Sequence, residues 1–209
     1  MRVRLTFAKT EAMRFTGNLD LHRTLERTIR RARLPLRYSQ GFTPRPKLTL
    51  ASALSLGFTS DAEMADMWLE EPLPLDHIAD AFRKASPPGV KLLELEEVDD
   101  GAEKLQNALR TAEYVFTLLD PPPPSLDANI GAMLAADALP RQRKKKKVYD
   151  LRPLILELCR IDDDDEGRAR LAVKTLSQEG KTGRADEILD QLGLDPLAVR
   201  VHRTRLNLE

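Results

Sequence analysis

The stretch Arg-Val-Arg-Leu-Thr-Phe-Ala-Lys at residues 2–9 sets how the fold begins, because Val3, Leu5 and Phe7 occupy alternate positions. This period of two is typical of a strand with one buried face, since successive strand side chains point to opposite sides of a sheet. The stretch also lacks the unbroken apolar block of a signal peptide. A strand followed by a helical pattern is how a βαββαβ unit starts.

The next pattern along the chain is helical. Its apolar stripe consists of Leu21, Leu25, Ile29 and Ala32. The helix is predicted to begin at about Asn18 or Asp20, either of which could cap it, and to end at about Arg33, before Pro35. A second face of this helix carries Arg23, Arg27, Arg30 and Arg31.

The remaining patterns complete one unit and then repeat its order, although the two halves share no residue-level identity. In the first half we expect strands over Lys47–Leu54, Glu63–Glu70 and Val90–Val98, and a helix over Pro74–Lys84. In the second half we expect strands over Ala112–Leu119, Val148–Ile161 (interrupted at Pro153), Ala169–Leu176 and Val199–Leu206, and helices over Ser125–Ala136 and Arg184–Leu192. The predicted fold is α+β, with two tandem ferredoxin-like (βαββαβ) units, residues 1–103 and 104–209, and mostly antiparallel sheets.

Composition narrows the function classes. The only cysteine among the 209 residues is Cys159, which excludes an internal disulfide and a cysteine-rich metal site. The three histidines have no second ligand at zinc-binding spacing, so no metal or cofactor is expected. No run of eighteen apolar residues exists, so no membrane span is expected. These features favour a soluble, cytoplasmic protein.

The net charge is zero, with 33 basic and 33 acidic residues, but the charges are segregated. Residues 1–47 contain twelve basic side chains and three acidic ones, and a second basic run covers residues 141–152. The compensating acidic residues lie at 61–103 and 162–166. Segregated charge gives each region a potential of definite sign. We therefore expect one basic face rather than a protein that binds any polyanion.

The segment Arg-Tyr-Ser-Gln-Gly-Phe-Thr-Pro-Arg-Pro-Lys at residues 37–47 combines rings, cations, a glycine and two prolines. Pro44 and Pro46 predict a stiff, extended connector rather than a helix, and Gly41 permits a positive φ. Such a connector holds Tyr38 and Phe42 at a spacing that suits stacking on bases. The alternative is a turn leading into a strand, with both rings in the core.

Three stretches together carry a resemblance to a known family. Residues 14–70, with the run Leu-Ala-Ser-Ala-Leu-Ser-Leu-Gly at 50–57, the Asp-Leu-Arg-Pro at 150–153 and the His-Arg-Thr at 202–204 resemble the uncharacterised bacterial radical-SAM-linked protein family, a domain of unknown function. Members of that family occur alone or fused behind a radical SAM domain, so the resemblance implies a radical SAM enzyme as partner. The family often has His where this chain has Asn18. A radical SAM enzyme needs three cysteines for its cluster, so this chain is not itself that enzyme.

The first functional hypothesis is a non-catalytic module that binds structured RNA and presents it to the radical SAM enzyme. Tyr38 and Phe42 would stack on bases, while Gln40 and Arg45 would read base edges. The phosphates would be neutralised by Arg23, Arg27, Lys144, Lys145, Lys146 and Lys147, and the remaining candidate contacts are Arg14, Lys47 and Arg152.

Four adjacent lysines fit a loop tip better than a strand, and a solvated loop without a partner is the alternative. Asp150 could pair with Arg152, either at a pocket floor or at the surface.

A second functional hypothesis is a metal-independent ribonuclease or RNA-modifying enzyme that uses His22 or Asp150. The third is a protein–protein adaptor, in which the acidic segment at 61–80 docks a basic partner.

Overall fold

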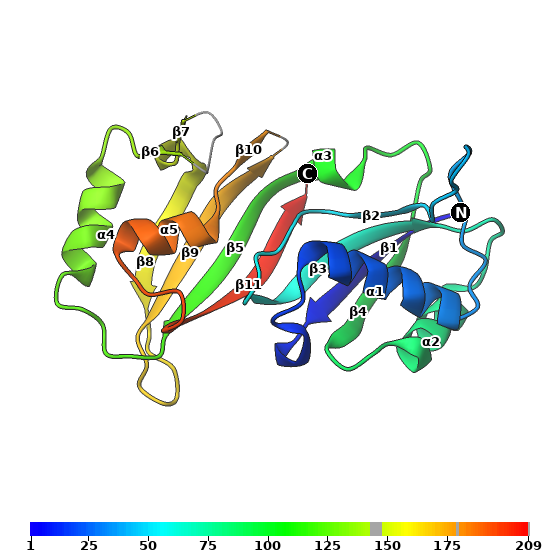
Figure 1. Ribbon diagram of the computed structural model, residues 1–209, viewed down its shortest axis with the longest axis horizontal. Helices are drawn as coiled ribbons and strands as arrows, with labels where there is room; N and C mark the ends of the chain where they lie inside the picture. The colour runs from blue at the N-terminus through cyan, green and yellow to red at the C-terminus, as the bar shows by residue number, and fades with distance from the viewer. Residues whose placement is uncertain (143–147, 179, 209) are drawn as a thin grey trace. The chain divides into compact units, whose positions relative to one another are not determined.

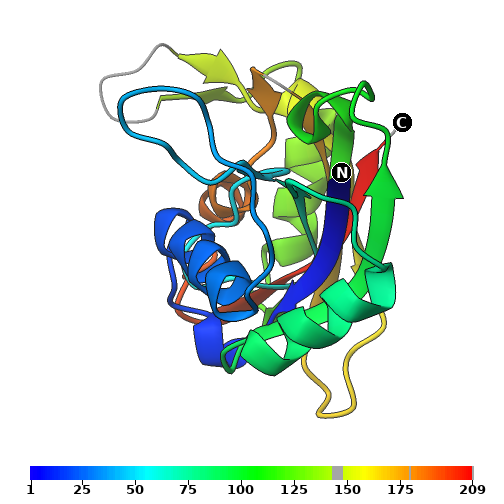
Figure 2. The same ribbon diagram turned by 90° about the vertical axis from the view of Figure 1, so that its right-hand side faces the viewer.

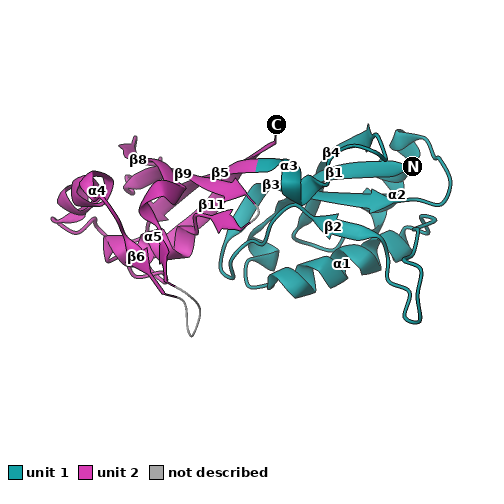
Figure 3. Ribbon diagram, turned by 90° about the horizontal axis from the view of Figure 1, so that it is seen from above, with its two compact units in different colours: residues 1–109 teal, residues 110–209 magenta. Residues whose placement is uncertain are grey.

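A computed structural model describes residues 1–142, 148–178 and 180–208. The chain divides into two compact units, residues 1–109 and 110–209 (Figure 3), whereas the sequence pattern placed the boundary between 103 and 104. Both units mix helices with antiparallel strand pairs, which confirms the α+β class. No helix in the described parts of the chain is long and apolar enough to cross a membrane.

The first unit contains four neighbouring strands and two long helices (Figure 1). Its elements are β1 (Arg2–Lys9), the 3-10 helix η1 (Glu11–Met13), α1 (Asn18–Arg31), β2 (Leu48–Leu50), β3 (Thr59–Trp68), α2 (Leu75–Ala85), β4 (Val90–Val98) and the short α3 (Leu105–Ala108). The strands lie in the order β2-β3-β1-β4, and every neighbouring pair is antiparallel.

The core of the first unit lies between the sheet and its two long helices, which Figure 2 shows in blue and green-cyan. The alternating residues of β1, Val3, Leu5 and Phe7, are buried there, as the pattern predicts. They share this core with Leu21, Leu25 and Ile29 from α1 and with Ile78 and Phe82 from α2.

Two local expectations for the first unit are wrong. Gly17 precedes α1 as its N-cap, and no side chain caps the helix, so neither Asn18 nor Asp20 has the expected role. The strand expected over Lys47–Leu54 is limited to Leu48–Leu50, because the chain then leaves β3 for a turn. At that turn Gly57 adopts φ +86° and its N–H donates to the Arg14 carbonyl at 3.1 Å.

The second unit also combines strands with two long helices. They are β5 (Leu109–Leu118), α4 (Leu126–Ala135), β6 (Pro140–Arg141), β7 (Tyr149–Asp150), η2 (Arg152–Leu154), β8 (Ile155–Ile161), β9 (Arg170–Gln178), β10 (Lys181–Thr182), α5 (Ala185–Leu192) and β11 (Val199–Leu208). β9 pairs antiparallel with β5, β8 and β10, and β11 lies beside β5. The predicted interruption at Pro153 is confirmed, since Pro153 lies in η2 between β7 and β8. Gly193 ends α5 at φ +72°, as expected.

Candidate nucleic-acid interface

Residues 37–47 form a closed hairpin that projects from the first unit (Figures 1 and 3). The Lys47 N–H donates to the Arg37 carbonyl at 2.8 Å, and the Ser39 N–H donates to the Arg45 carbonyl at 2.8 Å. The Arg45 N–H donates in turn to the Ser39 hydroxyl at 3.0 Å. The segment is therefore not helical, as the prolines predict, but its two arms are paired rather than a single extended connector. We call it the 37–47 hairpin.

The tip of the hairpin presents its aromatic ring to solvent. Gly41 adopts φ +142°, a conformation that favours glycine, and the adjacent Phe42 is fully exposed. Tyr38, in the first arm, keeps 37% of its surface exposed. The alternative in which both rings enter the core is therefore wrong, and both rings have surface available for stacking.

The hairpin and α1 together border a cleft of about 590 Å³, which we call the helix cleft. Its lining residues are Leu19, His22, Arg23, Glu26 and Arg30 from α1, and Pro44, Arg45, Pro46 and Leu48 from the hairpin and β2. The basic helix face and the hairpin thus meet in one site. Arg27 is exposed but does not line this cleft.

Two arginines of the helix cleft are available to a ligand. Arg23 is paired with Asp20 at 3.2 Å on the solvent side. Arg30 and Arg45 form no ion pair with any residue in the described parts of the chain. Arg30 was not among the site residues expected from sequence, although its position seven residues after Arg23 on the same helical face was a signal for it. Two unpaired arginines that line one cleft offer guanidinium groups for a phosphate.

His22 lies in the helix cleft between two hydrogen-bond acceptors. Its Nε2 lies 3.1 Å from the Leu48 carbonyl oxygen, and its Nδ1 lies 3.4 Å from the Glu26 carboxylate. The carbonyl oxygen and the carboxylate both accept hydrogen bonds, so each ring nitrogen has an acceptor of the protein beside it. Both ring nitrogens therefore face groups of the protein itself. The ring is arranged as part of the cleft wall rather than as a free base.

A second cleft of about 590 Å³ borders the hairpin, and we call it the Tyr38 cleft. It is lined by Met1, Arg37, Tyr38, Ser39, Gln40, Pro44, Leu69 and Glu70. Pro44 lines both clefts, but Gln40 lines only this one and Arg45 only the helix cleft. The two residues expected to read base edges together are therefore divided between two clefts.

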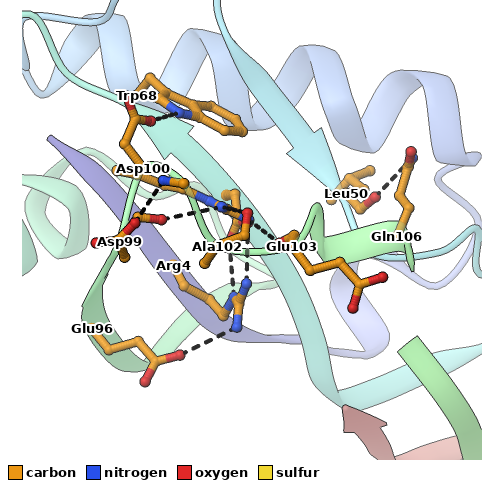
Figure 4. A network of polar contacts seen from close by, with 12 residues as sticks. Arg4, Leu50, Trp68, Glu96, Asp99, Asp100, Ala102, Glu103 and Gln106 are labelled. Atoms are coloured by element: carbon orange, nitrogen blue, oxygen red, sulfur yellow. Dashed lines mark hydrogen bonds and ion pairs between the residues drawn. The ribbon is translucent and has the colours of Figure 1, made fainter. Parts of the chain in front are cut away.

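A network of buried charges underlies the base of the hairpin (Figure 4). Asp66 is fully buried and accepts hydrogen bonds from Arg2 at 2.6 Å and from Arg4 at 2.9 Å. Arg2 also donates to the carbonyls of Asp99, Ala102 and Glu103. The network thus ties β1, β3 and the segment after β4 together.

Trp68, at the end of β3, joins this network to the hairpin. The Arg2 guanidinium lies 5.3 Å from the centre of its ring, and the Lys47 ammonium lies 5.8 Å from it. The ring N–H donates to Asp100 at 2.6 Å, while the backbone of Trp68 bonds to both Arg37 and Lys47. Lys47, an expected phosphate contact, is thus part of the support of the hairpin.

Two more of the expected arginines make contacts within the protein. Arg14 donates from Nε to the Gly57 carbonyl at 2.7 Å. Arg152 donates from Nε to the Leu134 carbonyl at 3.0 Å and from Nη1 to the Ile155 carbonyl at 3.1 Å. These bonds connect α4, η2 and β8.

The remaining expectations concern Asp150 and the lysine run. The Asp150 carboxylate accepts the backbone N–H groups of Leu139 at 2.7 Å and Arg152 at 2.9 Å, so the expected Asp150–Arg152 side-chain pair does not form. Lys144, Lys145, Lys146 and Lys147 lie outside the described residues. Within the described ranges, no group of three or more His, Cys, Asp or Glu side chains is arranged to hold a metal ion.

Comparison with known proteins assigns a family without a known chemistry. Residues 2–185 match the model of a family described as an uncharacterized protein conserved in bacteria (DUF2344). No curated protein matches the chain.

Proposed function

The chain belongs to this uncharacterized bacterial family, and on that premise we propose that it is a non-catalytic module that binds structured RNA and presents it to a radical SAM enzyme. The observation that carries the RNA-binding part is the helix cleft, where Arg30 and Arg45 face one space and have no ion-pair partner among the described residues. The fully exposed Phe42 ring lies on the same hairpin as Arg45. Cations beside an exposed ring match the phosphates and bases of an RNA chain.

The surroundings of His22 support the non-catalytic part of the proposal. Both ring nitrogens of His22 face acceptors of the protein, the Leu48 carbonyl and the Glu26 carboxylate. A general base needs a nitrogen within hydrogen-bond reach of the substrate proton. The radical SAM partner is supported by the resemblance of residues 14–57 and 150–153 to the radical-SAM-linked proteins.

We also infer that each unit is ferredoxin-like. In the first unit the strand order β2-β3-β1-β4 accompanies the chain order β1-α1-β2-β3-α2-β4. In the second unit β8, β9, β5 and β11 take the corresponding places, with α4 and α5 as the two helices. The equivalence of strand pairs supports a tandem repeat that residue identity does not reveal.

Salt dependence of RNA binding tests the proposal. The double variant Arg30→Gln with Arg45→Gln removes the two arginines of the helix cleft that form no ion pair in the described parts of the chain. Because each neutralised phosphate contributes about 0.7 to the slope of log K against log salt for a single strand, the slope should become shallower by about 1.4. The matched control is Arg33→Gln with Arg205→Gln, which removes two exposed arginines outside both clefts that form no ion pair in the described parts of the chain.

Binding to total bacterial RNA would be followed by filter retention between low and physiological salt. A wild-type protein that retains no RNA at low salt refutes the proposal. So does an equal slope for the cleft variant and the control, since the cleft arginines would then contribute nothing specific.

The non-catalytic part has its own test. The wild-type protein should leave labelled RNA intact in the absence of added metal. Metal-independent cleavage that His22→Ala abolishes, with an unchanged melting temperature, would instead establish the ribonuclease alternative.

A further inference from the structure

Phe15 lies outside the contacts described so far, in the turn between η1 and α1, and 74% of its surface is exposed. Single exposed apolar side chains are common on protein surfaces and by themselves indicate nothing. What distinguishes Phe15 is the way in which the chain around it is held.

The turn that carries Phe15 is bonded in both directions to the turn at Gly57. The Gly57 N–H donates to the Arg14 carbonyl at 3.1 Å, and the Arg14 guanidinium donates to the Gly57 carbonyl at 2.7 Å. The buried Lys9 ammonium donates to the carbonyls of Arg14 at 3.2 Å and Phe58 at 3.1 Å. The Arg14 guanidinium also lies 5.0 Å from the centre of the Phe15 ring. The ring is therefore held in an exposed position before any ligand arrives.

The position of the ring relates it to the helix cleft. Leu19, four residues later and equally exposed, lines that cleft in the first turn of α1. Leu56, also exposed, precedes the glycine that anchors Arg14. From Leu19 to Arg30 the helix rises about 16 Å at 1.5 Å per residue. The turn that carries the exposed Phe15 ring therefore leads directly into the helix whose first turn and Arg30 line the cleft.

We infer that Phe15 is a second base-stacking platform and that the RNA segment bound along α1 is unpaired. This inference rests on the proposed RNA binding. Bases in an A-form duplex are stacked on one another and present only their edges, whereas bases of a loop or a single strand can stack on protein rings. An exposed ring in the turn that leads into α1 therefore selects a strand whose bases are free. The charge of Arg30 and Arg45 supplies the contacts for its phosphates.

The experiment compares an unpaired RNA strand with a duplex of the same sequence. Each is about ten nucleotides long, within the site size of single-strand binders, and carries one fluorescent 2-aminopurine. Phe15→Ala should weaken binding of the single strand about tenfold and reduce the quenching of the fluorescent base, because one stacking contact is lost. Its effect on the duplex should be less than about twofold.

Two variants serve as controls. Phe15→Tyr keeps an aromatic face and should bind the single strand like the wild type. Leu197→Ala removes an equally exposed apolar side chain from the second unit and should also bind like the wild type.

The outcomes separate this inference from the proposed function. If the single strand binds with the expected dependence on Arg30 and Arg45 but Phe15→Ala has no effect, the RNA-binding proposal stands and the stacking inference is overturned. Equal losses for single strand and duplex in Phe15→Ala also overturn it. If neither RNA binds to the wild type, both proposals fall.

Discussion

Replacement of Asp66 by Asn should strongly destabilise the first unit. Asp66 is fully buried and its carboxylate accepts hydrogen bonds from Arg2 at 2.6 and 3.0 Å and from Arg4 at 2.9 and 3.2 Å. Asparagine has the same shape but no charge, and only one of its two terminal atoms accepts. Its amide group would also place donors against guanidinium donors. Arg2, itself buried, would then lack its counter-charge.

The magnitude follows from this burial. Removal of one partner from a buried ion pair costs about 3–5 kcal/mol. Arg4 is partly exposed, and the asparagine oxygen can still accept, so we expect the lower end, about 3 kcal/mol. For a unit of this size such a loss corresponds to a fall in Tm of about 12–24 °C. The matched control is Glu96→Gln, because Glu96 is more than half exposed and lies 3.6 Å from Arg4, which predicts a loss below about 1 kcal/mol.

Urea unfolding of the full chain measures both variants, with Trp68 fluorescence as the probe of the first unit. Trp68 is the chain's single tryptophan and lies over Arg2, so it reports directly on the network. The midpoint for Asp66→Asn should fall by about 1–3 M urea, at slopes typical of small domains. If Asp66→Asn and Glu96→Gln lose the same small amount, burial of the network does not govern stability and the reasoning is refuted.

Further predictions concern the second unit. Gly183→Ala should destabilise this unit by about 1–3 kcal/mol, because the added Cβ would lie 2.5 Å from the Leu154 carbonyl oxygen. Gly131→Ala should instead stabilise the unit by up to about 1 kcal/mol, because Gly131 lies in α4 and nothing lies within 4 Å of an added Cβ. Thermal unfolding of the two variants distinguishes these effects. Hydrogen bonds from Arg168 lower the pKa of Asp164 below its usual value, so its contribution to stability is present above about pH 4 and is lost as the pH falls through the lowered pKa. Asp164→Asn should therefore be less stable than the wild type at pH 7 and should converge with it in acid; a difference that persists at low pH would contradict this cause.

Local sequence patterns predicted a helix or strand correctly where residue spacing alone decides which way the side chains point. The alternation of Val3, Leu5 and Phe7 indicates which face of β1 is buried, because strand geometry alone sends alternate side chains to one side. Gly193 ends α5 for a similarly local reason, since φ +72° favours glycine. By contrast, the end of β2 at Leu50 depends on the turn at Gly57 and its bonds to Arg14, which no nearby residue encodes.

The closeness of the basic helix face to residues 37–47 along the chain favoured a shared site, but the residues that line each cleft were not predicted. The sequence indicates that residues 37–47 hold rings and cations outside a helix, and the exposure of Phe42 agrees with that reading. Only the structure shows that Arg37 and Trp68 bond through their backbones while Lys47 lies over the Trp68 ring. The charge of a side chain therefore did not indicate whether a basic residue makes contacts within the protein or lines a cleft.

By itself, the sequence determined the α+β class, the buried face of β1 and the non-helical character of the 37–47 hairpin, because each depends on residue spacing or on the restricted φ of proline and glycine. The tertiary structure decided that Arg30 and Arg45 face one cleft, that Gln40 belongs to another, and that Phe15 is held exposed by Arg14. These relations join residues distant along the chain, and their positions depend on strand pairing and packing, which local spacing does not specify.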